Sequence, residues 1–310
     1  MIHRDSRRSI TLVSSVCLAL VFLLPLLTSG QTLDPTSATK SDSQTTPTTN
    51  PTHDLEKKFF KNILSDQREI WTSPFHLARE DSSWAIPLTI SAATLIATDR
   101  HTSGELVENG DNPDRLRISK RVSQFGSIYA TGGAALSFYL VGLAKHDTRA
   151  RETGLLAAEA LINGGIVSGV LKGVSQRQRP STDDGSGEFL DGGSSFPSGH
   201  AVAIWSLTTV IADEYGKGRP ALRIGLYGLA SAVSISRYTG RNHFLSDVLI
   251  GSAIGYGIGH FVYKQHHDIA LDSGNEKLIS RTAHSKWIPE MTPQYNPRAH
   301  VYGARLAWEF

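Results

Sequence analysis

The chain has little of several features that define large protein classes. A single cysteine, Cys17, excludes an internal disulfide framework and any zinc or iron–sulfur site built from cysteines. The formal net charge is only +2, so the chain lacks the concentrated basic excess typical of nucleic-acid binding. Residues 84–263 show no sustained period-two alternation, which argues against a β-rich core. What remains, at 310 residues, is a helical chain with one large domain or two small ones.

The first 30 residues are typical of an export signal. Three arginines precede an apolar run over residues 10–27, and small residues at 28–30 offer a cleavage point. An uncleaved N-terminal anchor is the alternative, because the run approaches the length of a bilayer span. Residues 31–53 are rich in Thr, Ser and Pro and predict a disordered tether. We therefore expect an exported protein of the cell envelope.

Apolar segments of helical length follow the tether. They cover approximately residues 84–98, 122–144, 154–174, 198–215, 221–237 and 243–263. This pattern predicts an all-α bundle of about six core helices, within a domain at residues 54–270. Small residues repeat at four-residue spacing, which permits close helix packing: Gly165, Gly169 and Gly173, and again Gly251, Gly255 and Gly259. An amphipathic helix over residues 55–70 precedes the bundle and would pack on the core or lie on a membrane surface.

The end of the chain has a different character. Residues 271–310 form a polar tail, and apolar side chains alternate from Tyr302 to Phe310. The alternation predicts a short C-terminal strand, or a β-hairpin with residues 287–295. At the end of the last apolar segment, His260, His266 and His267 are interpreted as part of a solvated helix end.

Polar residues interrupt the apolar segments at their ends. Lys172 lies in the last turn of the third segment, Arg179 follows that segment, and PSGH at 197–200 opens the fourth. The stretch SRYTGRNHFLSD at 236–247 joins the fifth segment to the sixth. In an up-and-down bundle with short connections, these groups meet at one end. Arginine forks, a lysine and the free N–H groups of a helix start all favour phosphate, so the arrangement predicts a phosphate pocket.

Two histidines belong to this end. His243 has Asp247 one helical turn later, which would fix one ring nitrogen and leave the other as a nucleophile or metal ligand. His200 would serve as a general acid towards a leaving oxygen.

Taken together, the three groups resemble the three-part motif of the type 2 phosphatidic acid phosphatase and vanadium haloperoxidase superfamily, in its phosphatase branch. The parts are KGVSQRQRP (172–180), PSGH (197–200) and SRYTGRNHFLSD (236–247), and every motif position is occupied. The motif core spans residues 172–247. The resemblance implies a helical phosphatase domain with the active site at one end.

The resemblance also implies roles for individual residues. His243 would attack phosphorus and form a phosphohistidine, Asp247 would orient its ring, and His200 would protonate the leaving oxygen. The phosphate-binding residues would be Lys172, Arg179, Ser198, Gly199 and Arg237. The family requires no metal and no other cofactor, which suits a motif that has no carboxylate cluster beside it to hold magnesium.

The resulting hypothesis is a metal-independent phosphatase for phosphomonoesters or pyrophosphates. Its partner would be a phosphorylated lipid, of the phosphatidate or isoprenyl pyrophosphate type, or a small phosphoester, and not a nucleic acid. One alternative is a vanadate-dependent haloperoxidase in which His243 would coordinate vanadate. Another is a non-catalytic phospholipid-binding protein of the envelope.

Membrane placement gives two conflicting indications. Basic residues gather at the turns opposite the motif end, which favours an active site on the periplasmic or extracytoplasmic side. Counting the first three apolar segments as spans after an exported N-terminus would place the site inside. We expect membrane association with the site on the exported side.

Overall fold

The computed structural model describes residues 51–76, 78–108, 112–182, 186–268, 290–296 and 301–307. The predicted signal at 1–30 and nearly all of the predicted tether at 31–53 lie outside these residues. The chain divides into two units, one ending at His267 and one starting at Asp268.

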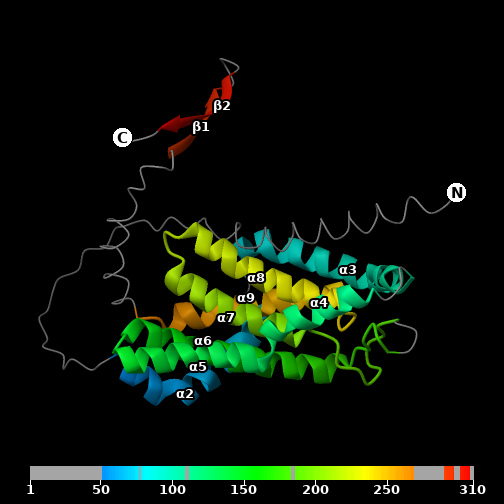
Figure 1. Cartoon of the computed structure of the whole chain (residues 1–310), viewed down its shortest axis with the longest axis horizontal. Coiled ribbons are helices and arrows are strands. Elements are labelled where there is room, and N and C mark those ends of the chain that lie inside the picture. Colours follow the sequence, from blue (N-terminus) through cyan, green and yellow to red (C-terminus); the bar gives the residue numbers. More distant parts are fainter. Residues whose placement is uncertain are drawn as a thin grey trace, which may run out of the picture. The chain divides into compact units, whose positions relative to one another are not determined.

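The regular elements in the described part of the first unit are all helices (Figure 1). Its α-helices are α2 (Pro51–Thr72), α3 (Ser82–Glu108), α4 (Pro113–Ser123), α5 (Ile128–Lys145), α6 (Thr148–Ser175), α7 (Gly199–Tyr215), α8 (Pro220–Thr239) and α9 (Leu245–His266). Short 3-10 turns are η2 (Ser73–His76), η3 (Arg79–Asp81) and η4 (Gln124–Gly126).

The helix boundaries have local causes in the sequence. The side chain of Asp147 accepts hydrogen bonds from the first amides of α6, at 3.0 Å from Arg149 N and 3.1 Å from Ala150 N. At the other end of α6, Gln176 has a φ of 42°, and its N–H bonds back to Lys172 O. The left-handed residue ends α6 four residues after Lys172 and starts the loop that carries Arg179.

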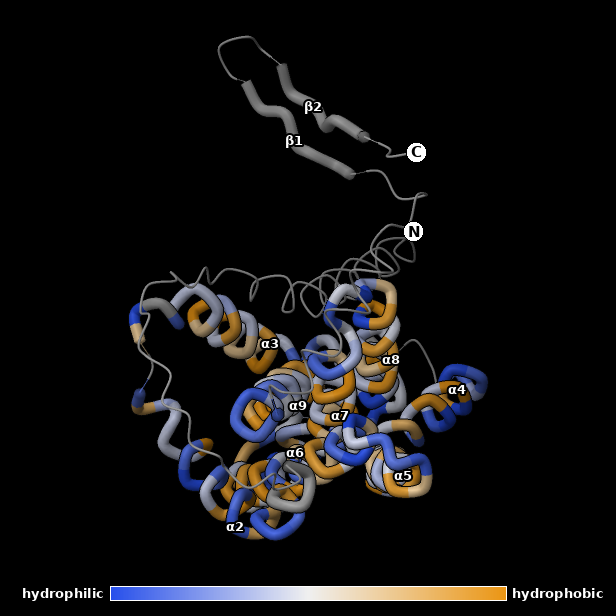
Figure 2. Tube along the Cα trace, turned by 90° about the vertical axis from the view of Figure 1, so that its left-hand side faces the viewer, coloured by the Kyte–Doolittle hydropathy of each residue, from blue (hydrophilic) through white to orange (hydrophobic). Residues whose placement is uncertain are grey.

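Helix α7 lies at the centre of the unit. It packs against α6, α8 and α9, while α5 and α2 cover α6, α3 covers α9, and α4 covers α8 (Figure 2). Its side chains Trp205 and Val210 are almost fully buried in the two apolar clusters of the core. Because α7 begins at Gly199, next to Ser198 and His200, this core also positions one motif segment.

The two glycine runs pack differently although their spacing is the same. On α9, a Cβ at Gly251 would lie 2.7 Å from the carbonyl oxygen of Ser198, the N-cap of α7, and a Cβ at Gly259 would lie 2.7 Å from that of Ser206 in α7. At Gly165, Gly169 and Gly173 of α6 nothing lies within 4 Å. The expected close helix approach is therefore confirmed for α9 against α7 and is wrong for α6.

The predicted fold class needs correction. The described part of the first unit has eight α-helices, α2 to α9, rather than about six core helices, and it contains no strand. Helix α2 matches the amphipathic helix expected over residues 55–70. Helix α4 was not predicted: it is rich in charged side chains, so a search for apolar segments does not find it. The predicted segment 122–144 is divided, because Ser127 ends η4 and caps α5 with its side chain.

The strands of the chain belong to the second unit. They are β1 (Glu290–Asn296) and β2 (Val301–Ala307), which pair in antiparallel register, with Tyr295 opposite Tyr302. The predicted fold class is therefore corrected to a purely helical first unit, with the two paired strands outside it. A separate unit carries the two strands.

Three helical stretches of the described residues are long and apolar enough to cross a membrane, judged by length and composition. They are Pro113–Lys145, Thr148–Ser175 and Leu245–His266. Only 17% of the apolar window of the first stretch is buried within the protein, against 56% and 61% for the other two. Helix α5 in particular exposes large apolar side chains such as Tyr129 and Leu136. These observations support a membrane association.

Candidate active site

The structure places the motif residues on the ends of helices and on the loops between them. Lys172 is in the last turn of α6, Ser198 is the N-cap of α7, and Arg237 is in the last turn of α8. Arg179 and His243 lie in loops, and Asp247 is in the first turn of α9. Electrostatic coupling joins His200 to Lys172, Arg179, Arg237 and His243, so the structure brings these groups together.

Cationic side chains gather at this end of the bundle. The ammonium group of Lys172 donates to the carbonyl oxygens of Ser194 and Pro197, both at 2.7 Å. Arg179 Nη2 lies 3.4 Å from Ser194 Oγ. Burial, together with the nearby charge of Arg179, lowers the pKa of Arg237 to about 10, which still leaves it charged at neutral pH. Three cations that face one another in this way favour an anionic ligand.

Two buried polar atoms lie among these cations. Nε of Arg237 and Oγ of Ser198 have no hydrogen-bond partner among the described residues. Their side chains are 8% and 0% exposed, so water satisfies them poorly. Buried donors without a partner are costly, and a ligand that accepts hydrogen bonds would satisfy these two. A phosphoryl group has the acceptor oxygens to fit them.

The imidazole of His243 is buried and held by backbone. Its Nδ1 lies 2.7 Å from the carbonyl oxygen of Ser195 and 3.6 Å from Oδ2 of Asp247. Because a carbonyl can only accept, Nδ1 must carry the proton, and Nε2 of the neutral ring keeps its lone pair. Burial lowers the pKa of His243, and Lys172 and Arg237 add to this effect while Asp247 opposes it. A neutral imidazole with a lone pair on Nε2 has the chemistry that a nucleophile needs.

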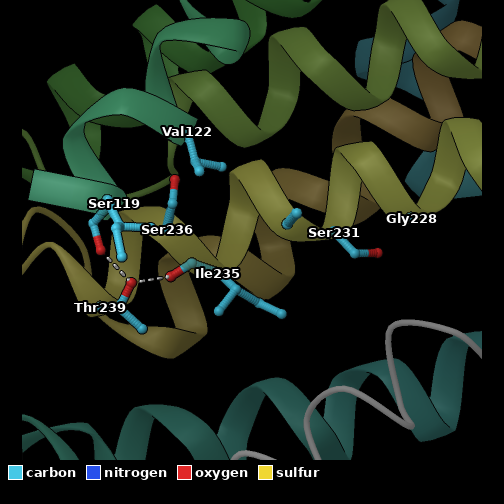
Figure 3. A pocket seen from close by; sticks show the side chains of 9 residues that line it. Ser119, Val122, Gly228, Ser231, Ile235, Ser236 and Thr239 are labelled. Atoms are coloured by element: carbon cyan, nitrogen blue, oxygen red, sulfur yellow. Dashed lines mark hydrogen bonds between the residues drawn. The ribbon is translucent and has the colours of Figure 1, made fainter. Parts of the chain in front are cut away.

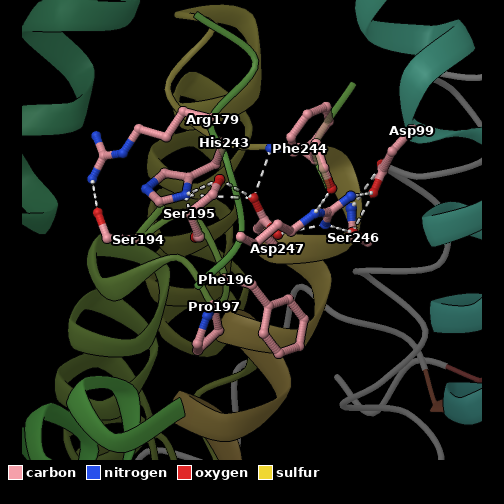
Figure 4. A network of polar contacts seen from close by, with 12 residues as sticks. Asp99, Arg179, Ser194, Ser195, Phe196, Pro197, His243, Phe244, Ser246 and Asp247 are labelled. Atoms are coloured by element: carbon pink, nitrogen blue, oxygen red, sulfur yellow. Dashed lines mark hydrogen bonds and ion pairs between the residues drawn. The ribbon is translucent and has the colours of Figure 1, made fainter. Parts of the chain in front are cut away.

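The expected role of Asp247 changes in consequence. Its Oδ2 accepts from Ser195 Oγ at 2.5 Å and from Phe244 N at 2.9 Å, so both hydrogen bonds compete with His243 for this oxygen. Asp247 supports the ring through its charge and through Ser195, while the Ser195 carbonyl supplies the direct hydrogen bond (Figure 4).

His200 has a different electrostatic environment from an ordinary surface histidine. Burial, followed by the charges of Arg237, His243, Lys172 and Arg179, lowers its pKa to about 4. In the unliganded protein His200 is therefore neutral at physiological pH. An anionic ligand among the same cations would cancel their effect and raise this pKa, so protonation of His200 is coupled to ligand binding.

Sequence reasoning missed an ion-pair network behind Asp247. Arg177 Nη1 donates to Asp247 Oδ1 at 2.7 Å, and Arg177 Nη2 donates to Asp99 Oδ2 at 2.8 Å. Ser246 Oγ accepts from Arg177 at 2.7 Å and donates to Asp99. The position of Arg177 inside the first motif segment was visible, but Asp99 lies 78 residues away and has no motif around it.

The loop between α6 and α7 is organised by backbone hydrogen bonds. Ser195 N donates to Arg177 O at 2.9 Å, and Ser198 N donates to Asp247 O at 3.0 Å. These two bonds place Ser195 beside His243 and fix the start of α7 against the start of α9. The loop therefore couples the first and third motif segments.

A cavity of about 440 Å³ lies between α4 and α8 (Figure 3). It is lined by Ile118, Ser119, Val122, Gly228, Ser231, Ala232, Ile235, Ser236 and Thr239. Ser119 and Thr239 close one side through a 2.7 Å hydrogen bond between their hydroxyl groups. Since Ser236 precedes Arg237, this largely apolar lining begins one residue from the cationic cluster.

The opposite end of the bundle holds a second set of buried charges. His267 Nδ1 lies 2.8 Å from Glu152 and 3.2 Å from Glu214. His266 Nε2 lies 2.9 Å from Asp66 and 3.1 Å from Glu159. The interpretation of His266 and His267 as solvated was wrong. His267 contacts buried carboxylates of α6 and α7, and His266 contacts buried carboxylates of α2 and α6. His260 is half-buried and pairs with Asp213 at 2.6 Å.

Among the described residues, the donor atoms of these two clusters lie close enough together to hold a metal ion. They are Asp66, Glu159 and His266, and Glu152, Glu214 and His267. Within the second cluster, Arg149 Nε lies 2.5 Å from Glu214, so cations of the protein already balance its carboxylates. Both clusters use the ends of α6 and α9 remote from Lys172 and Asp247.

Comparison with known proteins gives a family match over the same part of the chain. The PAP2 superfamily model matches residues 153–270, which confirms the predicted resemblance over this segment. A Lipid A 1-phosphatase of Porphyromonas gingivalis is 38% identical over 69 residues, or 22% of this chain. The aligned segment spans 16% of the length of that protein.

Two solved structures are similar at lower identity. The crystal structure of Aquifex aeolicus LpxE is 20% identical with a TM-score of 0.41, and the alignment covers 51% of this chain and 91% of that one. A transmembrane PAP2-type phosphatidylglycerolphosphate phosphatase from Bacillus subtilis is 19% identical with a TM-score of 0.47, covering 59% and 96%.

Proposed function

We propose, with the PAP2 superfamily match of residues 153–270 as the premise, that the chain is a phosphatase of phosphorylated lipids. The observation that carries the proposal is the meeting of Lys172, Arg179 and Arg237 around two histidines, with buried donors of Ser198 and Arg237 lacking a protein partner. The alternative, a non-catalytic phospholipid-binding protein of the envelope, would need the phosphate cluster but not a buried neutral histidine.

The proposed reaction has two steps. Nε2 of His243 attacks phosphorus, the bond from phosphorus to the leaving oxygen breaks, and His200 gives that oxygen a proton. His200, now neutral, then takes a proton from water as the water oxygen attacks the phosphohistidine. The phosphorus–nitrogen bond breaks, the electron pair returns to His243, and inorganic phosphate leaves.

Charge explains the roles of the remaining residues in this proposal. The cations and Ser198 would stabilise the phosphoryl oxygens as their charge grows in the transition state, with the amide of Gly199 at the start of α7. The carboxylate of Asp247, 3.6 Å from Nδ1, would stabilise the positive charge that phosphorylation puts on His243.

The lipid part of the proposal rests on surface chemistry. Exposed apolar side chains cover α5 and one face of α6, where Ile162, Ile166 and Val170 are 41%, 40% and 44% exposed. Such a surface suits hydrocarbon better than water. The apolar cavity beside Ser236 would place a hydrocarbon chain next to the phosphate cluster. The similarity to a Lipid A 1-phosphatase adds lipid A to the candidate substrates.

We further propose that the active site faces the exported side of the membrane. The basic turns at the opposite end, between α5 and α6 and between α7 and α8, would then face the cytoplasm. Accessibility of a cysteine introduced at Ser181, beside the motif, to an impermeant thiol reagent in intact cells tests this orientation, with Cys17→Ser as the background.

The test of function is phosphate release by the full chain in detergent with a chelator present. The substrates are phosphatidate, an isoprenyl pyrophosphate, lipid A and a soluble aryl phosphate. Asp213→Asn is the control variant, because Asp213 pairs with Arg223 and His260 away from the site. We expect turnover of at least one lipid substrate, loss in His243→Ala, and inhibition by vanadate. Activity that appears only with vanadate and peroxide would replace the proposal with a haloperoxidase, and tight binding without turnover with a binding protein.

A further inference from the structure

Arg177 is the most buried cation of the motif region, and it does not join the phosphate cluster. Its guanidinium donates to Asp99, Asp247, Ser246 Oγ and the carbonyl of Gly187, at 2.7 to 3.0 Å. The side chain is 2% exposed. These hydrogen bonds hold the guanidinium behind the proposed nucleophile, against α3, the start of α9 and the loop that contains Gly187.

Aromatic rings complete the enclosure of this guanidinium. Its central carbon lies 4.3 Å from the ring centroid of Phe244 and 4.7 Å from that of Phe189. Phe244 follows His243 in the chain, so the ring that covers Arg177 is one residue from the nucleophile. A bidentate fork held between two rings has little freedom to move, which is why lysine would be a poor replacement.

The network links α3 to the start of α9 through charge. Asp99 and Asp247 are 1% and 0% exposed, and they share one guanidinium. With both carboxylates ionised, the three groups carry a net charge of −1. If Asp99 were absent, the positive charge of Arg177 would cancel that of Asp247, and the imidazole would face no net negative charge on this side.

We propose that Asp99 and Arg177 are positioning residues for the nucleophile, and that together they hold the Asp247 carboxylate in place and leave one net negative charge beneath the His243 ring. Arg177 fixes Oδ1 of Asp247, which leaves Oδ2 for Ser195 and Phe244. Asp99 offsets the charge of Arg177. The proposal rests on the proposed phosphohistidine reaction, in which His243 becomes positively charged.

Other charged groups also face His243. Lys172 on α6, Arg237 on α8 and His200 on α7 disfavour a positive ring, and Asp247 on α9 favours it. Asp99 and Arg177 act on the same balance from behind Asp247. Removing Asp99 and removing Arg177 should therefore shift the pKa of His243 in opposite directions. An ion pair that only stabilises the fold would not produce this pair of shifts.

The experiment measures the pKa of His243 and the kinetics in the same variants. Full-chain protein labelled with ¹³C at histidine Cε1 is titrated by NMR in detergent, and the His243 signal is identified by its loss in His243→Ala. The variants are Asp99→Asn, Arg177→Gln and Arg177→Lys. Asp213→Asn is the matched control, a buried aspartate in an ion pair at the other end of the bundle.

We expect Asp99→Asn to lower the pKa of His243 and Arg177→Gln to raise it, with no shift in Asp213→Asn. In kinetics, Asp99→Asn and Arg177→Lys should lower kcat about tenfold or more and change KM by less than about threefold, because neither residue touches the phosphoryl group. The acidic limb of the kcat/KM profile should move to lower pH in Asp99→Asn.

An unchanged His243 pKa in Asp99→Asn, or shifts of the same sign in Asp99→Asn and Arg177→Gln, would overturn the proposal. If Arg177→Gln does not fold, Arg177→Lys decides: it keeps the charge, so the pKa should hold while kcat falls, and unchanged kcat rejects the positioning role. If the two variants shift the His243 pKa in opposite directions but the wild type shows no turnover, the phosphatase function is rejected. The effect of Asp99 and Arg177 on the charge at His243 would still stand.

Discussion

The two ends of the helical bundle use the same residue types for opposite purposes. At the motif end, His200 and His243 stand among cations and burial lowers their pKa values, that of His200 to about 4. At the other end, burial also acts to lower the pKa of His267, but Glu152 and Glu214 outweigh it and raise the value to about 10. A buried histidine is thus neutral at one end and charged at the other.

The difference shows what distinguishes a reactive site from a structural one. At the remote end, carboxylates balance the histidines and Arg149, so charge is neutralised within the protein. At the motif end, the charges that act on His200 are those of Arg237, Lys172 and Arg179, together with His243. Charge left unbalanced by the fold is available for a ligand.

The largest effect expected from breaking this contrast is on activity at the motif end. His243→Ala should lower kcat by a factor on the order of 10⁴ or more, since no other described residue can replace the nucleophile. Its melting temperature should stay close to that of the wild type. Phosphate release and thermal unfolding of the same preparation check both, and turnover above about 1% would contradict the assignment.

The corresponding change at the remote end should cost stability and spare catalysis. His267→Gln removes the buried cation between Glu152 and Glu214 while Arg149 still pairs with Glu214, and we expect a loss of about 3 kcal/mol with kcat unchanged. Denaturant unfolding in detergent measures the loss.

The same ion pair predicts a pH dependence of stability. The folded pKa of His267, about 10, lies above its ordinary value of 6.5, so the stabilisation is complete below pH 6.5 and is lost as pH rises towards 10. The melting temperature of the wild type should therefore fall more steeply over this range than that of His267→Gln. Parallel curves would contradict the charged state of His267.

The contrast also depends on the register of α7 and α9, because each helix carries residues of both ends. A Cβ at Gly259 would lie 2.7 Å from Ser206 O and 2.9 Å from Thr209 Cβ, so Gly259→Ala should destabilise the fold by about 1–3 kcal/mol. Gly169→Ala is the matched control in open space and should stabilise α6 by about 0.5–1 kcal/mol. Changes of the same sign in the free energy of unfolding of the two variants would contradict the packing difference between α9 and α6.

The smallest expected effect is a difference between two pH profiles. In the free protein the cations hold the pKa of His200 near 4, and a bound phosphate would raise it. The basic limb of kcat should therefore lie at higher pH than that of kcat/KM, by about one unit or more. Coincident limbs would show that substrate does not neutralise the cationic cluster.

The sequence predicted the residues of the motif end but not those of the remote end. Lys172, Arg179, His200, Arg237 and His243 each mark a helix end, and alternating helices bring such ends together. The remote end carries no motif: Glu152 and His267 are 115 residues apart, and nothing in the local pattern pairs them. Apolar periodicity likewise found the long helices but not the charged helix α4, and equal glycine spacing gave no way to tell α9 from α6.

The sequence by itself determined the helical character of residues 84–263 and the chemistry gathered at one end of the bundle. Periodicity and helix order are local properties, and the motif residues lie where helices stop. Only the tertiary structure decided which partners meet across distant segments. It put the Ser195 carbonyl on His243, joined Asp99 through Arg177 to Asp247, and buried His267 between two glutamates, because burial and charge pairing depend on side chains that the chain brings together only when it folds.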